Sequence, residues 1–226
     1  MTPLCLGINL AVEPISVGLT RGQTPVALFS GCPGYSFSEN LITEIDKIAR
    51  QNNQNLSEIQ AIGIVNGPGS YTGLRISTTF AKTVCQLQSI PLYAFSTLEA
   101  FCYQYRFFDG TYLSVMPACR NEINAALLGV KNGIITRLTD DFTCLTDTLI
   151  KNIQPIQGKL YVIGVFNDII KTALQAHSNL ICVPTVLNGT TIAQMASDHI
   201  GHNKPGDYRK IIPCYSHQPQ IGRLKE

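Results

Sequence analysis

Residues 62–75, which read Ile-Gly-Ile-Val-Asn-Gly-Pro-Gly-Ser-Tyr-Thr-Gly-Leu-Arg, decide the fold of this chain. The run at 62–65 is apolar and β-branched, which predicts a buried strand. Pro68 fixes its own φ, and the glycines on either side of it permit a tight turn. Ser70 or Thr72 is placed to cap a helix that begins after this turn. The stretch therefore predicts a strand, a turn and a helix in close succession.

A glycine-rich turn that opens onto a helix presents free backbone N–H groups, which can receive an anion. The candidate contacts in this stretch are Gly67, Gly69, Ser70 and Arg75. The alternative is that the glycines only make a tight connection. The turn lacks the Lys-Ser/Thr of a P-loop, so the sequence leaves both interpretations open.

Composition limits the kind of protein this is. The 226 residues are 45% hydrophobic and 14% charged, which predicts a well-filled core. The net charge of +2 gives no electrostatic footprint of a stand-alone nucleic-acid binder. The sequence shows neither a membrane-spanning run nor the basic start of a secretory signal. Eight dispersed cysteines without a Cys-x-x-Cys pair indicate reduced thiols, so we expect a cytoplasmic protein.

The two halves of the chain predict the same order of elements: three strands, helix, strand, helix, strand, helix. This order indicates a structural duplication without obvious sequence repetition. We expect a first lobe at 1–107 and a second at 108–226, and leave open whether the last helix or the tail packs back on the first lobe. The predicted strands are 4–10, 15–20, 24–30, 61–66, 90–95, 111–116, 124–130, 134–138, 160–164 and 180–183, and the predicted helices are 38–52, 70–88, 97–106, 145–152, 167–175 and 188–200.

The helix predicted at 70–88 carries a small residue every four positions, from Gly73 to Cys85. Such a stripe lets another helix approach closely, either within the same lobe or from a second chain. The helix predicted at 38–52 also has an apolar face. The predicted partner-contact residues are Leu41, Ile45, Tyr71, Gly73, Leu74, Ser77, Phe80, Ala81 and Val84.

The stretch at 66–76, Asn-Gly-Pro-Gly-Ser-Tyr-Thr-Gly-Leu-Arg-Ile, resembles the GPGSFTGxRIG signature of the TsaB (YeaZ) family. Its continuation also matches, at Ala81-Lys82, at Ile90-Pro91 and at the capping-box sequence Ser96-Thr-Leu-Glu99. The resemblance implies an α/β protein of the actin/hexokinase/Hsp70-like (ASKHA) fold. Such a protein has two structurally duplicated lobes, each with a mixed sheet flanked by helices.

The resemblance also implies a function. It suggests a non-catalytic subunit of the complex that makes N6-threonylcarbamoyladenosine at position 37 of tRNA. Such a subunit dimerises with a TsaD-like subunit and activates it, and a TsaE-like ATPase joins the assembly. It implies contact with tRNA only through the complex and a homodimer when the chain is alone. It implies no cofactor held by this chain, while leaving open an adenine nucleotide at the complex interface.

The chain departs from the family pattern where a nucleotide would be bound. The usual Asp-Thr-Ser after the first strand reads Asn9-Leu10-Ala11, so Asn9 is the remaining candidate contact there. Pro117 replaces the Asp that opens the second lobe, and His217 stands in the usual Leu-Arg position near the end. These changes disfavour nucleotide binding by this chain alone.

Catalytic interpretations have less support. His199-Ile-Gly-His202 is the one histidine pair with ligand-like spacing, and it lacks a neighbouring third ligand, so we expect no metal and no catalytic residue. Two alternatives to the accessory subunit remain. One is an ATP-binding or sugar-kinase-like enzyme of the same fold, and the other is a binding module with a different protein partner.

Overall fold

The computed structural model describes residues 2–31, 37–153, 156, 158–175, 179–203 and 206–216, arranged around two mixed β-sheets. The first sheet has the order β3-β2-β1-β4-β5. Strands β1 to β3 are antiparallel, whereas β4 and β5 run parallel to β1 and to each other. Its strands are β1 (Leu4–Asn9), β2 (Ser16–Arg21), β3 (Thr24–Ser30), β4 (Ile59–Gly67) and β5 (Leu92–Ser96).

The second sheet repeats this pattern. Its order is β11-β10-β6-β7-β8, with β9 paired to β7. Here too the first three strands are antiparallel and the next two are parallel to the first. The duplication and the mixed sheets expected from the sequence are thus confirmed. The strands are β6 (Gly110–Pro117), β7 (Glu122–Lys131), β8 (Ile134–Arg137), β9 (Phe142–Leu145), β10 (Leu160–Gly164) and β11 (Leu180–Pro184).

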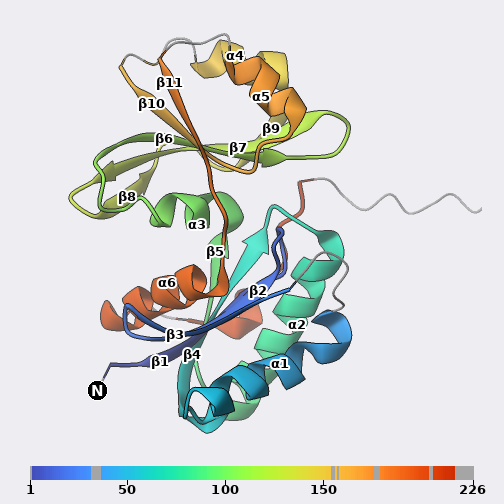
Figure 1. Cartoon of the computed structure of the whole chain (residues 1–226), viewed down its shortest axis with the longest axis vertical. Coiled ribbons are helices and arrows are strands. Elements are labelled where there is room, and N and C mark those ends of the chain that lie inside the picture. The colour runs from blue at the N-terminus through green and yellow to red at the C-terminus, as the bar shows by residue number, and fades with distance from the viewer. Residues whose placement is uncertain are drawn as a thin grey trace, which may run out of the picture.

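Helices cover both faces of each sheet, in layers that Figure 1 shows from bottom to top. Helices α1 (Phe37–Gln51) and α2 (Tyr71–Gln88) cover the outer face of the first sheet, and α4 (Thr146–Ile153) and α5 (Asp168–Gln175) cover the outer face of the second. Helices α3 (Thr97–Tyr103) and α6 (Gly189–Gly201) lie between the sheets. Successive side chains of β1 point to opposite faces of the first sheet, so both faces need a covering layer. Leu4, Leu6 and Ile8 face α1 and α2, while Cys5 faces α6.

Helix α6 comes from the end of the chain yet packs on the first sheet. Gly7 pairs with Gly18 on one side and with Gly63 on the other, so three glycines form a row across β2, β1 and β4. A Cβ at Gly7 would lie 2.0 Å from the Gly189 carbonyl oxygen. The backbone of α6 therefore sits directly on the sheet, because no side chain separates them. The division of the chain at residue 107 remains a prediction.

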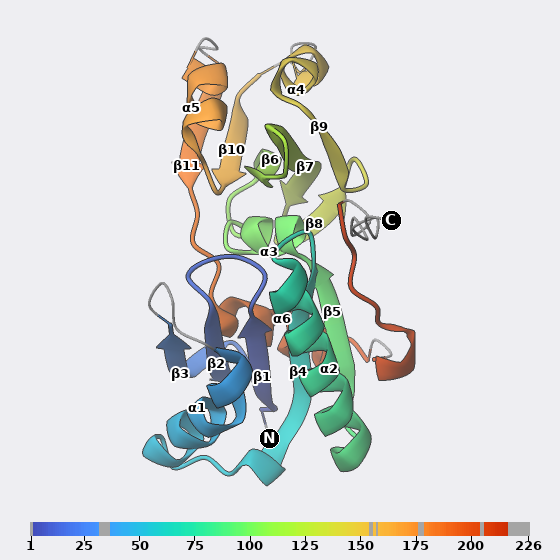
Figure 2. The ribbon, with the colours of Figure 1, turned by 90° about the vertical axis from the view of Figure 1, so that its right-hand side faces the viewer.

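The segment at 206–216 runs back along α2 towards the second lobe (Figure 2). The Lys82 ammonium donates to the Ile211 carbonyl at 3.0 Å, and the Cys214 N–H donates to the Asn66 carbonyl at 2.6 Å. The sequence did not predict β9 or the short helices η1 (Leu56–Glu58) and η2 (Tyr208–Lys210), because each is only three or four residues long. The other predicted elements are confirmed to within a few residues at their ends.

Candidate functional site

The turn between β4 and α2 opens a capped helix, as the sequence predicts. Ser70 is the N-cap, and its Oγ accepts the Gly73 N–H at 3.2 Å. The Gly67–Pro68 peptide bond is cis, and Gly67 and Gly69 have φ values of 131° and 159°. The predicted anion contacts Gly67, Gly69 and Ser70 thus lie together at the start of α2.

The chain itself packs against this turn from two sides. The Ser70 N–H donates to the Ala11 carbonyl at 2.7 Å. A Cβ at Gly69 would lie 2.6 Å from that same oxygen, and a Cβ at Gly67 would lie 2.0 Å from the Cys214 carbonyl oxygen. Because these glycines have no side chain, the backbone at residues 11 and 214 packs directly against the turn.

The Asn9 side chain is surrounded by backbone groups of the chain itself. It is fully buried, and its Nδ2 lies 2.8 Å from the Val12 carbonyl oxygen, 3.1 Å from that of Pro14 and 3.0 Å from that of Leu187. Its Oδ1 accepts the N–H groups of Ala11 and Val12. The side chain thus holds the loop after β1 in shape and ties it to the segment before α6.

Arg75 lies on the exposed side of α2. Its guanidinium donates to the Tyr71 hydroxyl at 3.1 Å and lies 5.3 Å from the centroid of that ring. Tyr71 in turn contacts the Tyr215 ring, with 4.8 Å between centroids. The structure therefore groups Arg75 with the tail segment and separates it from Asn9, which points into the core.

Most of the predicted partner-contact residues pack inside their own lobe. Gly73, Leu74, Ser77 and Ala81 face the sheet, and a Cβ at Gly73 would lie 1.7 Å from the Leu10 carbonyl oxygen. On α1, Leu41 and Ile45 are buried against the same sheet. The small-residue stripe thus serves the within-lobe packing that the sequence left open. An intact lobe does not present these six residues to a second chain.

The outward face of α1 and α2 carries apolar residues of its own. Tyr71 is 41% exposed, and Phe80 and Val84 are half-buried at the rim of the packed face. Ile42 and Leu87 are 67% and 79% exposed. Sequence reasoning did not include these two among the partner-contact residues, although a large apolar residue at an outward helix position was the available signal.

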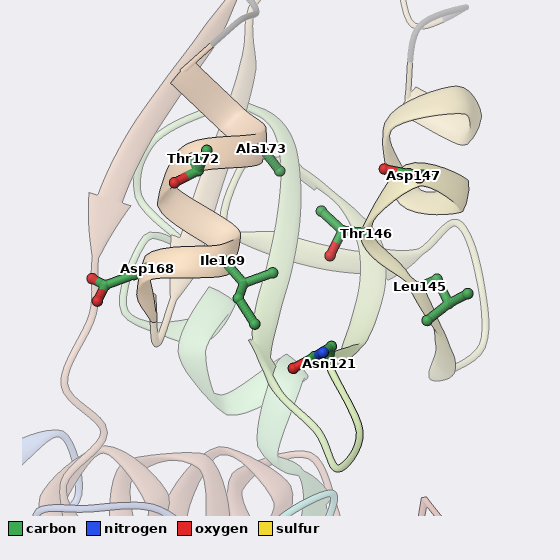
Figure 3. A pocket seen from close by; sticks show the side chains of 8 residues that line it. All are labelled: Asn121, Leu145, Thr146, Asp147, Asp168, Ile169, Thr172 and Ala173. Atoms are coloured by element: carbon green, nitrogen blue, oxygen red, sulfur yellow. The ribbon is translucent and has the colours of Figure 1, made fainter.

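A groove of about 630 Å³ lies between α4 and α5 on the second lobe (Figure 3). Leu145, Ile169 and Ala173 give it apolar walls. Asp147 and Asp168 occupy the first turns of the two helices, where a carboxylate is stabilised by the helix dipole. Negative charge at both helix starts disfavours a phosphate here. Sequence reasoning missed this groove, since its walls come from elements that are distant along the chain.

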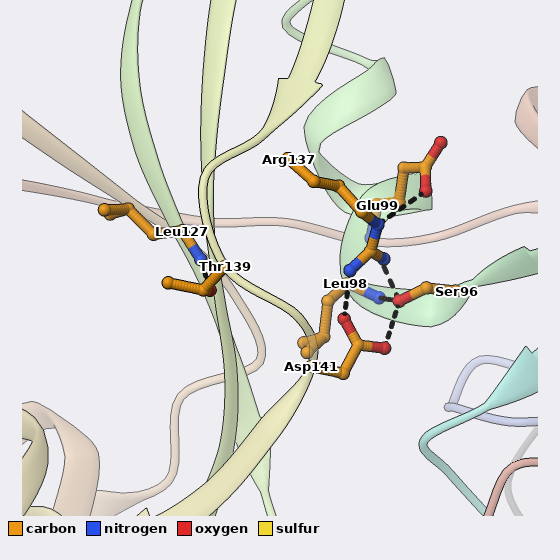
Figure 4. Close-up of polar contacts among 7 residues, drawn as sticks. All are labelled: Ser96, Leu98, Glu99, Leu127, Arg137, Thr139 and Asp141. Atoms are coloured by element: carbon orange, nitrogen blue, oxygen red, sulfur yellow. Dashed lines mark hydrogen bonds and ion pairs between the residues drawn. The ribbon is translucent and has the colours of Figure 1, made fainter.

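Polar contacts join α3 to the second lobe (Figure 4). The Ser96 Oγ accepts the Leu98 and Glu99 N–H groups, as a helix cap should, and donates to Asp141 Oδ2 at 2.6 Å. The Glu99 carboxylate reaches Arg137 of β8, which also binds Asp141. Glu99 therefore links two parts of the molecule in addition to its place in the cap.

Pockets of about 410 Å³ and 260 Å³ lie beside this network. Asp141 lines the larger together with Pro68 and Tyr215, and Glu99 lines the smaller together with His199 and His202. The Nδ1 atoms of the two histidines lie 3.1 Å and 2.7 Å from the carbonyl oxygens of Met195 and Asp198. Within the described ranges, no three potential ligands gather as a metal site would require. His217 lies outside the described residues.

Two lobes with duplicated mixed sheets, joined across a central pair of helices, define the actin-like ATPase fold. Solved structures share it. The protein similar to peptidase YeaZ from Pseudomonas aeruginosa has a TM-score of 0.79 at 13% identity, over 95% of this chain and 100% of that one. YeaZ from Pseudomonas aeruginosa has a TM-score of 0.76 at 16% identity, over 94% and 99%. The ROK hexokinase of Thermus thermophilus has a TM-score of 0.52 at 11% identity, over 87% and 99%.

Sequence comparison is more specific. The model for TsaD, tRNA N6-adenosine threonylcarbamoyltransferase, matches residues 35–151, about half of the chain. The tRNA threonylcarbamoyladenosine biosynthesis protein TsaB of Bacillus subtilis is 28% identical over 136 residues, 60% of this chain and 59% of that protein. The protein of the same name from Escherichia coli is 31% identical over 93 residues, 41% and 40%. The chain belongs to the TsaB (YeaZ) family, which is related to TsaD, and it spans about half the length of these curated relatives.

Proposed function

We propose that this chain is a non-catalytic, cytoplasmic subunit of the complex that makes N6-threonylcarbamoyladenosine at position 37 of tRNA. It docks on a TsaD-like subunit and activates it by holding that subunit's lobes in an active arrangement. Both family relatives from Bacillus subtilis and Escherichia coli carry the name of this biosynthesis. None of the helices in the described part of the chain is long and apolar enough to cross a membrane.

The observation that carries the non-catalytic role is the environment of Asn9. A nucleotide-binding loop at this position needs side chains and N–H groups that are free to contact phosphates. Here the Asn9 side-chain amide is hydrogen-bonded to carbonyl groups of the chain's own backbone, and the Ala11 carbonyl accepts the Ser70 N–H. The fold is kept, while the loop that would hold phosphates serves to pack the lobe.

The docking surface that we propose is the outward face of α1 and α2. It contains the exposed residues Ile42, Tyr71 and Leu87, with Phe80 and Val84 at its inner edge. Exposed apolar residues on neighbouring helices are typical of a protein interface. This surface replaces the small-residue stripe in the docking hypothesis, because the stripe is already covered by the sheet of its own lobe.

The decisive experiment is co-purification with the TsaD-like protein of the same genome. Ile42→Glu places a charge in the docking surface, and Ile134→Glu is a matched control because both isoleucines are 67% exposed. We expect Ile42→Glu to weaken pairing at least tenfold and Ile134→Glu to leave it unchanged. Equal pairing by the two variants would contradict the docking surface.

Ala81→Glu is a poor test of docking. Ala81 is fully buried against the sheet, so a carboxylate there would unfold the lobe before it reached any partner. Circular dichroism of each variant separates loss of folding from loss of pairing.

The same reconstitution tests the other members of the proposed assembly. Adding a TsaE-like ATPase, tRNA, an adenine nucleotide and an activated threonylcarbamoyl donor to the pair should restore formation of the modified base. Light scattering of the isolated chain tests the homodimer. Tight Mg-ATP binding and turnover by the isolated chain, measured by calorimetry, would favour the sugar-kinase-like alternative. Failure to pair with TsaD, together with capture of another protein, would favour the different binding module.

A further inference from the structure

Two loops lie side by side at one end of the second sheet (Figure 1). Residues 104–109 join α3 to β6, and the turn at 132–133, counted here with its flanking strand ends as the loop 131–134, joins β7 to β8. The Asn132 N–H donates to the Asp109 carboxylate at 2.8 Å, which fixes one loop against the other. Neither loop belongs to the surface of α1 and α2 proposed above for docking.

The first loop exposes two consecutive aromatic side chains. Phe107 is 73% exposed and Phe108 is 67% exposed. The backbone beneath them is nevertheless held, because the Phe108 N–H donates to the Tyr105 carbonyl at 2.9 Å and the Tyr112 hydroxyl donates to the Phe108 carbonyl at 2.8 Å. The rings are therefore presented to solvent from a fixed loop.

A guanidinium group completes a stack on this loop. Arg106 lies 4.0 Å from the centroid of the Tyr103 ring and 4.3 Å from that of Phe107, so it touches both aromatic groups. Its Nη1 donates to the Tyr103 carbonyl and its Nη2 to Gln23, which hold it in place. The Phe107 ring thus extends a stack that is already ordered on one side.

The charge on the two loops is positive. Arg106 and Lys131 are their cations, and Asp109 is their single carboxylate. In the described part of the chain neither cation is paired with a carboxylate, whereas Asp109 accepts the Asn132 N–H. Lys131 is exposed beside the aromatic loop, where its ammonium can meet an anion.

We propose that these two loops bind unpaired nucleotides of RNA. Bases stack on Phe107 and Phe108, and Lys131 contacts a phosphate. Exposed aromatic rings beside cations are how proteins hold single strands, because each base has a face that stacks. The ten residues of the two loops are too few for a stable protein interface, which takes roughly 20 to 30 residues a side. A single-stranded site needs room for only a few nucleotides.

This site predicts weak, stacking-dominated binding. The whole chain carries a net charge of only +2, so long-range attraction adds little. With one phosphate contact, from Lys131, the logarithm of the binding constant should fall with the logarithm of salt concentration with a slope of about −0.7. Duplex RNA should bind much less well, since its bases are stacked on one another.

The test uses the isolated chain and a fluorescently labelled, unstructured ten-nucleotide RNA, with binding followed by anisotropy. We expect Phe107→Ala and Phe108→Ala each to weaken binding about tenfold. Ile212→Ala is the matched control, because Ile212 is 70% exposed and lies on the tail segment. Lys131→Gln should reduce the salt slope by about 0.7, which reports the phosphate contact even if an aromatic variant folds poorly.

Unchanged binding by both phenylalanine variants would overturn the proposal, as would equal affinity for a duplex of the same sequence. Loss of a protein partner from these variants with RNA binding intact would also overturn it, in favour of a protein surface. The assay contains no TsaD-like subunit, so its failure is distinct from failure of the docking proposal.

Discussion

Arg137 of strand β8 and Glu99 of helix α3 form an ion pair with 3.2 Å between Nε and Oε2. The Arg137 Nη1 also binds Asp141 at 2.8 Å, and Asp141 accepts the Ser96 hydroxyl. All three charged side chains are about 30% exposed, so water screens them only in part. Glu99 and Ser96 stand where the first sheet ends and α3 begins, and the network fastens this junction to the second lobe.

Arg137→Met should lower the free energy of unfolding by about 1–2 kcal/mol, because it leaves two half-buried carboxylates close together without their cation. Urea denaturation measures this change. Arg21→Met is the control, since Arg21 pairs with Glu58 at 3.0 Å in a more exposed place, with exposures of 39% and 54%. We expect a loss below about 1 kcal/mol there. Equal losses from the two variants would show that the Arg137 network adds nothing beyond a surface ion pair.

Gly7→Ala should destabilise the protein by about 3 kcal/mol or more, because the new Cβ would meet the α6 backbone. The methyl group would lie 2.0 Å from the Gly189 carbonyl oxygen. Gly201→Ala is the control, since no atom lies within 4 Å of a Cβ at that position in α6. Thermal unfolding should show a large fall in Tm for Gly7→Ala and a small rise or no change for Gly201→Ala. A small effect at Gly7 would mean that α6 can move away from the sheet without cost.

Buried thiols should make stability fall at alkaline pH. Burial raises the pKa of Cys5, Cys85 and Cys102 from an ordinary value near 9.0 to about 12. Below pH 9 both the folded and the unfolded chain keep these thiols protonated, so they add no pH dependence. Between pH 9 and 12 only the unfolded chain ionises them. Each thiol then lowers the free energy of unfolding by about 1.4 kcal/mol per pH unit.

Urea denaturation between pH 8 and pH 10.5 measures this slope. Cys102→Ser would remove one thiol but leave a buried hydroxyl, so Cys102→Ala is the better variant, with a shallower slope expected. Alkylation at pH 8 followed by peptide mapping gives an independent check. The exposed Cys119, Cys182 and Cys214 should be labelled in the native protein, and the three buried thiols only after unfolding. Labelling of Cys5 at the rate of Cys119 would contradict the burial.

Lys82→Met should loosen the tail segment from α2. The Lys82 ammonium donates to the Ile211 carbonyl, and loss of this charged hydrogen bond should raise local opening about fivefold. Trypsin cleavage after Arg209 and Lys210, followed by mass spectrometry, reports the opening. Lys151→Met, at an exposed position of helix α4, is the control. Cleavage at the same rate in both variants would mean that Asn66 and Cys214 hold the segment without Lys82.

The sequence predicted the element order well, because local signals mark each part. The apolar run at 62–65, the turn around Pro68 and the Ser70 cap all lie within one short stretch, and the structure has them as expected. The sequence left open which surface the small-residue stripe of α2 meets. Small residues at Gly73, Ser77 and Ala81 are equally suited to a partner helix or to a sheet, and only tertiary structure shows which of the two lies against them.

The glycine row under α6 was also beyond the reach of sequence reasoning. Gly7, Gly18 and Gly63 lie far apart along the chain and become neighbours only through strand register. The groove between α4 and α5 and the link from Glu99 to Arg137 arise in the same way. The sequence shows aromatic residues at 107 and 108, but it does not predict that they are exposed, since apolar residues usually pack inside.

The position of α6 on the first sheet has a consequence for the order in which the protein can be made. A ribosome releases residues 1–107 first, yet the glycine row of this first sheet stays uncovered until α6 at Gly189–Gly201 has emerged. Helix α3, which covers the second sheet, is by contrast translated before the strands of that sheet. During synthesis the inner face of the second sheet can therefore meet α3 before α6 emerges, whereas the same face of the first sheet waits until residue 201 has been translated.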